Sequence, residues 1–251
     1  MTRKKLTLIG LLAALVACGL SSAVARAECG GVAPEHKCVW EVKETLGGAF
    51  EEFSLVEEEI NTIGNELSTF KLKAGAKEIK CTTVNFFNVL AGGKPGRDYA
   101  DKFLLTVCTT TEGECKVKSK GNTKAGEILI TNIRTTLVER EKGAEKNILS
   151  DNFEQKTRKH VKEWVTLEFG KKEKVVEAGT RFEHKVLEEV CAGYPLNTKV
   201  KGNMAAKVEA EKLNFPAEEL SGNTFEAFGL AAVLSGTVKV VLEEPGEYRA
   251  S

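Results

Sequence analysis

The sequence is short of the residues on which most nucleophilic and metal-dependent enzymes rely. Its 251 residues include three histidines, and none of them stands in a His-Glu-x-x-His zinc motif. There is no Gly-x-Ser-x-Gly elbow for a serine nucleophile, and no two cysteines have the C-x-x-C spacing of a zinc ribbon or a redox site. Standard phosphate and calcium loops are missing as well. The sequence therefore predicts no catalytic residue, no cofactor and no metal ligand.

Aromatic residues and prolines are also scarce. Aromatic residues make up 7% of the chain, and there are five prolines. The 42% hydrophobic and 29% charged residues are ordinary for a globular protein, which excludes a disordered or collagen-like chain. The low aromatic share predicts a core filled mainly by Val, Ile and Leu rather than a large aromatic-lined pocket.

An excess of either charge is absent from the whole chain, but the balance changes if the N-terminus is removed. Residues 1–27 have the basic start, the apolar run from Leu6 to about Leu20 and the Ala-x-Ala sites of a signal peptide. They hold four of the 36 basic residues and none of the 36 acidic ones, so cleavage leaves 32 against 36. We expect a mildly acidic, secreted protein that does not bind nucleic acid. No later apolar run approaches the roughly 18 residues of a membrane helix.

The same N-terminal segment allows a second interpretation. Leu15-Val16-Ala17-Cys18 fits the bacterial lipobox, in which cleavage precedes a cysteine that is then lipidated. The segment after Cys18 stays apolar and ends in a good Ala-x-Ala site, which favours simple secretion. Lipid anchoring to the outer face of the membrane through Cys18 is the alternative.

Setting Cys18 aside leaves an even number of cysteines, which predicts disulfides in an oxidising compartment. The six are Cys29, Cys38, Cys81, Cys108, Cys115 and Cys191. We expect Cys81 to pair with Cys115, Cys108 with Cys191, and Cys29 with Cys38. The alternative pairs Cys81 with Cys108 and Cys115 with Cys191.

The preferred pairing rests on an internal similarity. Val-Cys at 107–108 is followed by Lys-Val-Lys at 116–118, and Val-Cys at 190–191 is followed by Lys-Val-Lys at 199–201. The separation is the same both times, and chance in a Lys- and Val-rich chain explains it equally well. If it marks a duplication, Trp164 and Thr198 replace Cys81 and Cys115 in the second copy, as if one bridge were missing.

Apolar residues after position 69 mostly alternate, which predicts strands. Phe70 and Leu72 precede an Ala-Gly turn, and Ile79 and Cys81 follow it, as in a hairpin. The segment 92–98 reads as a turn or loop. We expect a mainly β protein, an antiparallel sandwich or barrel. It would have an N-terminal disulfide loop at 28–68 and a β-rich domain at 69–251, with two related units around 69–139 and 155–242.

One segment before this domain has helical rather than alternating periodicity. Its apolar residues are three or four apart, with glutamates between them, which predicts a short N-terminal helix. These residues are Phe50, Phe53, Val56, Ile60, Ile63 and Leu67. At the other end of the chain, residues 243–251 are expected to form a frayed end.

Four strings resemble an abundant class of uncharacterised secreted proteins from high-GC soil actinobacteria. They are Gly92-Gly93-Lys94-Pro95-Gly96, Cys115-Lys116-Val117-Lys118-Ser119, the stretch 126–139, and Leu234-Ser235-Gly236-Thr237-Val238-Lys239-Val240. The charged stretch 140–162 departs from the pattern of that class. The resemblance implies a signal peptide followed by one β-rich, cysteine-containing domain, and it implies no functional residue.

Together these features predict a non-enzymatic β-domain, a structural or binding module of the cell envelope. The partner is unknown, and an envelope component or a polysaccharide fits best. The alternatives are a secreted polysaccharide hydrolase with a carboxylate pair and an extracellular inhibitor or effector. A deep cleft with two facing acids would favour the hydrolase, whereas a shallow apolar or aromatic patch rimmed by polar groups would favour binding. Four aromatic residues are open to either a core role or a sugar-stacking platform: Trp40, Tyr99, Trp164 and Tyr194.

Overall fold

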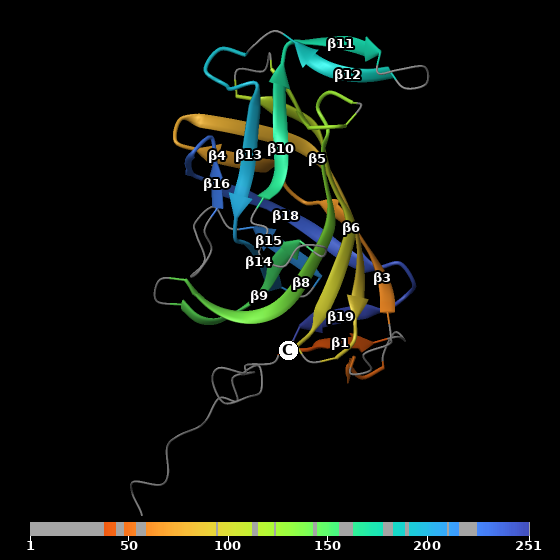
Figure 1. Cartoon of the computed structure of the whole chain (residues 1–251). Helices are drawn as coiled ribbons and strands as arrows, with labels where there is room; N and C mark the ends of the chain where they lie inside the picture. The colour runs from red at the N-terminus through yellow and green to blue at the C-terminus, as the bar shows by residue number, and fades with distance from the viewer. Residues whose placement is uncertain are drawn as a thin grey trace, which may run out of the picture.

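A computed structural model describes most of the chain. The described residues are 38–43, 48–53, 59–93, 95–111, 115–122, 124–142, 145–155, 163–177, 183–188, 191–209, 211–215 and 225–250. Every regular element within these ranges is a β-strand (Figure 1), which confirms the all-β prediction. The expected signal peptide, Cys18 and Cys29 lie outside them.

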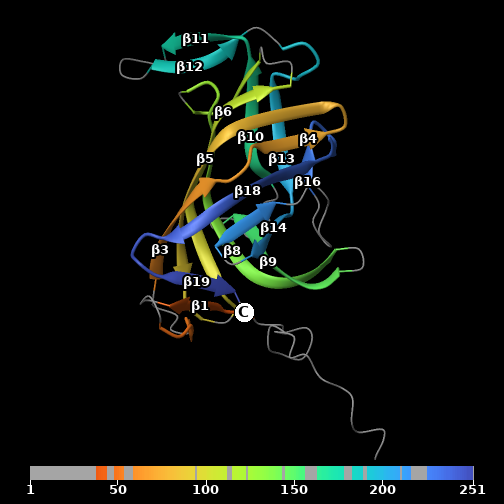
Figure 2. The same ribbon diagram turned by 180° about the vertical axis from the view of Figure 1, so that it is seen from behind.

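Eight antiparallel strands form a closed barrel, which is one of the two expected architectures. They follow one another around the wall in chain order, and the last pairs with the first (Figure 1 and Figure 2). Closure leaves no open edge in the wall. The strands are β3 (Glu59–Glu66), β5 (Lys77–Ala91), β6 (Arg97–Thr110), β8 (Ile128–Lys142), β9 (Glu145–Gln155), β14 (Met204–Glu209), β15 (Lys212–Phe215) and β18 (Val233–Leu242).

A further strand extends one position of the wall. β4 (Phe70–Ala74) lies between β5 and β18, as β3 does. β3 and β4 therefore share one position in the barrel wall, like a single strand that is interrupted between them. The interruption is held to β18, because the Leu67 amide donates to the Thr237 carbonyl and the Thr237 amide donates to Ser68 Oγ. The predicted hairpin around the Ala-Gly turn is thus confirmed.

A second group of strands, here called the cover sheet, branches from β6 and packs on one end of the barrel (Figure 1). The two Lys-Val-Lys triplets lie in β7 and β13, on either side of β10. The stretches 69–139 and 155–242 do not form separate barrels, since both supply strands to the same one. The cover sheet consists of β7 (Lys116–Ser119), β10 (Glu163–Gly170), β13 (Asn197–Gly202), β16 (Phe225–Ala227) and β17 (Leu230–Ala231), and a separate hairpin joins β11 (Lys172–Glu177) to β12 (Glu183–Glu188).

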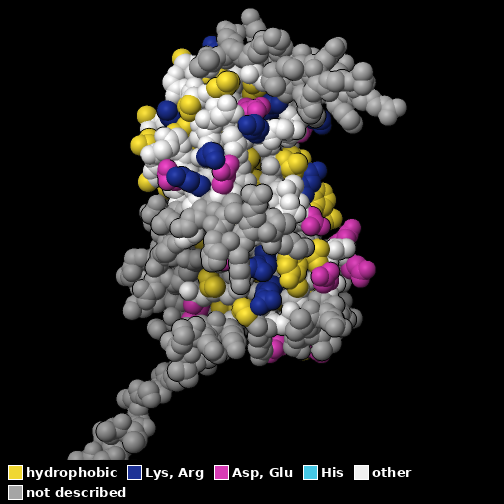
Figure 3. Space-filling view, viewed as in Figure 1, with side chains coloured by type: hydrophobic (Ala, Val, Ile, Leu, Met, Phe, Trp, Pro, Cys, Tyr) yellow, Lys and Arg dark blue, Asp and Glu magenta, His cyan; other side chains and the backbone are white. Residues whose placement is uncertain are grey.

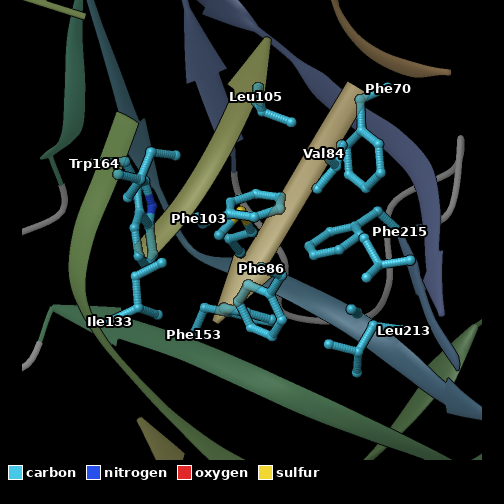
Figure 4. Packing of buried hydrophobic residues seen from close by; sticks show 14 of the residues in the cluster. Phe70, Val84, Phe86, Phe103, Leu105, Ile133, Phe153, Trp164, Leu213 and Phe215 are labelled. Atoms are coloured by element: carbon cyan, nitrogen blue, oxygen red, sulfur yellow. The ribbon is translucent and has the colours of Figure 1, made fainter. Parts of the chain in front are cut away.

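Phenylalanine fills the centre of the barrel. Five buried rings from five strands touch one another with centroid distances between 5.5 and 6.1 Å (Figure 4). Val, Ile and Leu surround this cluster. The expected core of Val, Ile and Leu therefore describes the periphery of the barrel interior and not its centre. Such ring contacts add to the free energy gained by burying the side chains. The five are Phe70, Phe86, Phe103, Phe153 and Phe215.

The predicted N-terminal helix is wrong where the structure describes that segment. Residues 51–52 form β2 (Glu51–Glu52), and residues 59–66 form β3, while positions 54–58 lie outside the described ranges. In β3 the buried positions are Thr62 and Gly64, and Ile63 faces outward. Ile60, Thr62 and Gly64 share the inward face of this strand, whereas Ile63 is on the opposite face. The three-residue spacing of the two isoleucines therefore does not mark one face of a helix.

Replacing Gly64 by alanine separates the two interpretations by the sign of its effect. In a helix the change would raise the free energy of unfolding by up to about 1 kcal/mol. In β3 an added Cβ would lie 2.8 Å from Phe86 Cβ and 2.7 Å from Val238 Cγ1. We therefore expect the free energy of unfolding to fall by about 2 kcal/mol. Urea unfolding of both proteins measures the difference, and a stabilised variant would contradict the strand.

The C-terminus is not frayed. β19 (Glu247–Ala250) pairs with β1 (Trp40–Lys43), which also pairs with β2, and we call these three strands the end sheet. The rings of Trp40 and Tyr248 meet edge to face with centroids 5.6 Å apart, and the Tyr248 hydroxyl donates to the Val240 carbonyl. The prediction failed because the strand's partner lies some 200 residues earlier in the chain.

The two described disulfides follow the alternative pairing. Cys81 bonds to Cys108 and Cys115 bonds to Cys191, so the preferred pairing of these four residues is wrong. The preferred pairing assumed a duplicated unit and did not consider how β5 and β6 pair. Their register places Cys81 directly opposite Cys108, with their Cα atoms 4.1 Å apart. Cys38 is also in a disulfide. Its predicted pairing with Cys29 lies partly outside the described residues.

Candidate functional site

Two carboxyl groups lie inside the barrel, near the end that the end sheet covers. Asp98 of β6 and Asp151 of β9 are 1% and 0% exposed. Asn88 donates from Nδ2 to Asp98, and the Thr135 hydroxyl donates to Asp151 at 3.3 Å. Burial raises the pKa of Asp98 to about 7. Burial, and then repulsion by Asp98, raise the pKa of Asp151 well above its ordinary value.

This acid pair does not have the setting that a polysaccharide hydrolase needs. A glycosidase uses two carboxyl groups that flank a sugar bond in an open cleft. Here both groups are enclosed, and Trp40 and Tyr248 lie close by in the end sheet, at 1% and 4% exposure. A sugar chain would have to displace the end sheet to reach them. The pair therefore gives the hydrolase alternative no support.

A small apolar cavity lies at the opposite end, between the barrel and the cover sheet. Its volume is about 30 Å³, and its walls include Phe70, Phe103, Val200, Met204 and Leu234. A cavity that binds benzene has about 150 Å³. This space is therefore too small for an organic ligand without movement of its walls, and we regard it as a packing gap.

The four aromatic residues considered for a sugar-stacking platform do not come together. Trp40, Trp164 and Tyr194 are all less than 10% exposed and have core roles. The Trp164 Nε1 donates to the Gly202 carbonyl, and Tyr194 stacks on Phe169 with ring centroids 5.3 Å apart. Tyr99 of β6 is half-buried. Its register neighbours are Val89 and Arg134.

An apolar surface that sequence reasoning missed lies on the outer wall of the barrel. Phe87 of β5 is 43% exposed, and its register neighbour is Ile63 of β3, which in turn faces Val241 of β18. One step along the strands, Val89 faces Tyr99 of β6. We call these five residues the outer patch. Figure 3 shows hydrophobic side chains along the flank where Figure 1 places β5 and β6.

Polar groups border the outer patch. Asn65 and Asn85 face each other on one side of it, and Asn61 faces Val89 on the other. No hydrogen bond occupies these three side-chain amides in the described part of the chain. The Lys102 ammonium lies 5.7 Å from the centroid of the Phe87 ring. An exposed aromatic ring among unoccupied amides can stack on a flat apolar face and hydrogen-bond at its edge.

The remaining candidates add no site. His184 is in β12, and the other two histidines, His36 and His160, lie outside the described residues. Over the described ranges, no three or more His, Cys, Asp or Glu side chains are grouped to hold a metal ion. The same ranges contain no helix with the length and hydropathy to cross a membrane.

Comparison with known proteins adds no relative from which a role could be transferred. No family model, no curated protein and no solved structure matches the chain.

Proposed function

We propose that this protein is an exported, non-enzymatic binding module of the cell envelope, and that its outer patch binds a neutral polysaccharide. The observation that carries the proposal is Phe87, a 43% exposed ring whose neighbours on adjoining strands are apolar and whose border is formed by Asn61, Asn65 and Asn85. Sugar rings offer a flat C–H face and a hydroxyl edge, so they match both parts of this surface.

The disulfides support an oxidising, extracellular location. Both described bonds join buried cysteines, and such bonds persist outside the cytosol. Residues 1–27, with their signal-peptide pattern, supply a route for export. Secretion into the medium and lipid anchoring through Cys18 would both place the barrel outside the cell.

Charges near the outer patch favour a neutral ligand. Lys102 is next to Asp101 in the chain, and Arg134 forms an ion pair with Glu154 at 3.1 Å. Cations and anions thus alternate on this flank, and neither sign dominates. A strongly anionic or cationic polymer would meet repulsion as well as attraction there.

Replacing Phe87 by alanine should weaken polysaccharide binding about tenfold, or about 1.4 kcal/mol, because a stacked ring is lost. Calorimetric titrations with cellohexaose, xylohexaose, mannohexaose and chitohexaose measure the affinity. Leu196→Ala is the matched control, since Leu196 is 45% exposed and lies away from the outer patch, beside β13. It should bind like the unmodified protein.

Two results would contradict the proposal. One is binding to none of the four oligosaccharides, and the other is equal binding by the Phe87 and Leu196 variants. Release of reducing ends is followed in the same samples. Hydrolysis of any of the sugars would overturn the non-enzymatic part of the proposal.

A further inference from the structure

The acid pair leaves three buried oxygen atoms without a hydrogen-bond partner: Asp98 Oδ1, Asp151 Oδ2 and Asn88 Oδ1. All three are acceptors when the acids are ionised. Within the described residues, no Lys, Arg or His forms an ion pair with either acid. A buried charge without a counter-charge lowers the stability of the folded state, and so does a buried acceptor without a donor.

Protons remove both costs at once. A protonated carboxyl carries no charge and has one O–H donor. Protonation of Asp98 and Asp151 therefore converts two of the three unpartnered acceptors into donors. The Asn88 Oδ1 is an acceptor beside Asp98, because the same amide group already donates to that acid through Nδ2. The enclosed site thus fits the neutral acids better than their anions.

The end sheet lies against the strands that carry the two acids. Gly96, two residues before Asp98, donates its amide to the Cys38 carbonyl, and its Cα approaches the Trp40 ring so closely that a Cβ would lie 3.0 Å from Cδ1. Leu137 is the register partner of Asp151, and its amide donates to the Gly96 carbonyl. β1 therefore packs on the backbone segments next to both acids.

Among the described residues, the titratable groups that interact with the pair are acids. Tyr248 of β19 is near enough to Asp98 and Asp151 for both to raise its pKa, after burial itself, and Glu211 adds a smaller effect. Asn88 of β5 and Thr135 of β8 complete the surroundings with neutral groups. Trp40 of β1 lies against Gly96 and Tyr248, and its buried Nε1 donor has no hydrogen-bond partner in the described part of the chain. Ionisation of the pair would therefore add negative charge where no cationic group of the described residues compensates for it.

We propose that protonation of Asp98 and Asp151 keeps the end sheet closed over the barrel, and that ionisation of the pair opens it. The end sheet is built of short strands, since β1, β2 and β19 have four, two and four residues whereas β5 and β8 have 15 each. Short strands with few contacts open at lower free energy than long central ones. Opening would let water solvate the carboxylates.

Amide hydrogen exchange between pH 5 and 7 tests the proposal on the full chain. The reporters are the Gly96 amide, which donates to Cys38, and the Phe53 amide, which donates to Trp40. Their protection factors, corrected for intrinsic exchange, should fall about tenfold per pH unit for each proton released on opening. Urea up to 1 M should barely change them, because a local opening exposes little surface.

The variant Asp98→Asn with Asp151→Asn keeps the shape of the site and cannot ionise. It should lose the pH dependence at Gly96 and Phe53. Asp101→Asn is the matched control, because Asp101 is an exposed aspartate of the same strand, and it should retain the dependence. Persistence of the slope in the double variant overturns the proposal, as does the full urea dependence of global unfolding at both reporters. Neither outcome depends on sugar binding.

Discussion

Replacing both Cys115 and Cys191 by alanine should lower the free energy of unfolding by about 4.5 kcal/mol. The bond joins residues 76 positions apart, and on the chain-entropy model the loss grows with the logarithm of the loop that the bond closes. Cys115 precedes β7 and Cys191 precedes β13, so the bond holds the cover sheet together. Urea unfolding of the oxidised proteins measures the loss.

The matched control removes the other disulfide. Cys81 and Cys108 are 27 positions apart, so Cys81→Ala with Cys108→Ala should cost about 3.5 kcal/mol on the same model. Their strands also remain paired along most of their length without the bond. A larger loss from Cys81 and Cys108 than from Cys115 and Cys191 would contradict the loop-length account. Non-reducing peptide mapping of each double variant should find the other of these two bonds intact.

Raising the pH from 4 to 7 should lower the free energy of unfolding by about 3 kcal/mol through Asp98 alone. Its pKa is about 7 in the folded protein, against an ordinary 3.8, and each unit of difference is worth about 1.36 kcal/mol. In this range the folded state keeps a proton that the unfolded chain releases. The stabilisation is therefore complete below about pH 4 and is lost as the pH rises towards 7.

Denaturant titrations at four pH values between 4 and 7 measure this trend. Asp98→Asn should flatten it, although Asp151 will leave a residual slope because its pKa is raised as well. Asp101→Asn should behave like the unmodified protein. A free energy of unfolding that rises with pH over the whole range, as for proteins rich in paired surface carboxylates, would contradict the prediction. It would show that the buried acids do not dominate the pH dependence of stability.

The hairpin formed by β4 and β5 was accessible from sequence for a simple physical reason. Phe70 and Leu72 alternate with lysines, and an Ala-Gly turn separates them from Ile79 and Cys81. The first half of the long strand β8 also carries a local signal, since it is rich in the β-branched residues Ile and Thr. β3 was not, because two of its inward positions are Thr62 and Gly64, and Gly64 is required by the close approach of Phe86 and Val238. Only the packed barrel explains those residues.

The candidate sites lay beyond sequence reasoning because they depend on register. Phe86 and Phe87 are neighbours in the chain, yet one fills the core and the other faces outward. Alternation counted from Cys81 would reverse them, but the inward and outward positions of β5 change phase at Thr82 and Thr83. Val107, opposite this point in β6, has a left-handed φ of 53°. Asp98 was hidden in a predicted turn, whereas β6 begins one residue before it. No local sequence pattern signals the outward position of Phe87 or the place of Asp98 in a strand.

The closing pair of the barrel, β18 with β3, also determines when the fold can be completed during synthesis. Thr62 pairs with Leu242, so the first wall strand lacks one neighbour until residue 242 has been made, 180 residues later. Until then β3 has one unpaired edge, and such edges promote association between chains. Contacts this distant in sequence also slow folding. A nascent chain of this protein therefore depends on β18 to complete the barrel, and truncation after β15 should produce aggregates rather than a smaller barrel.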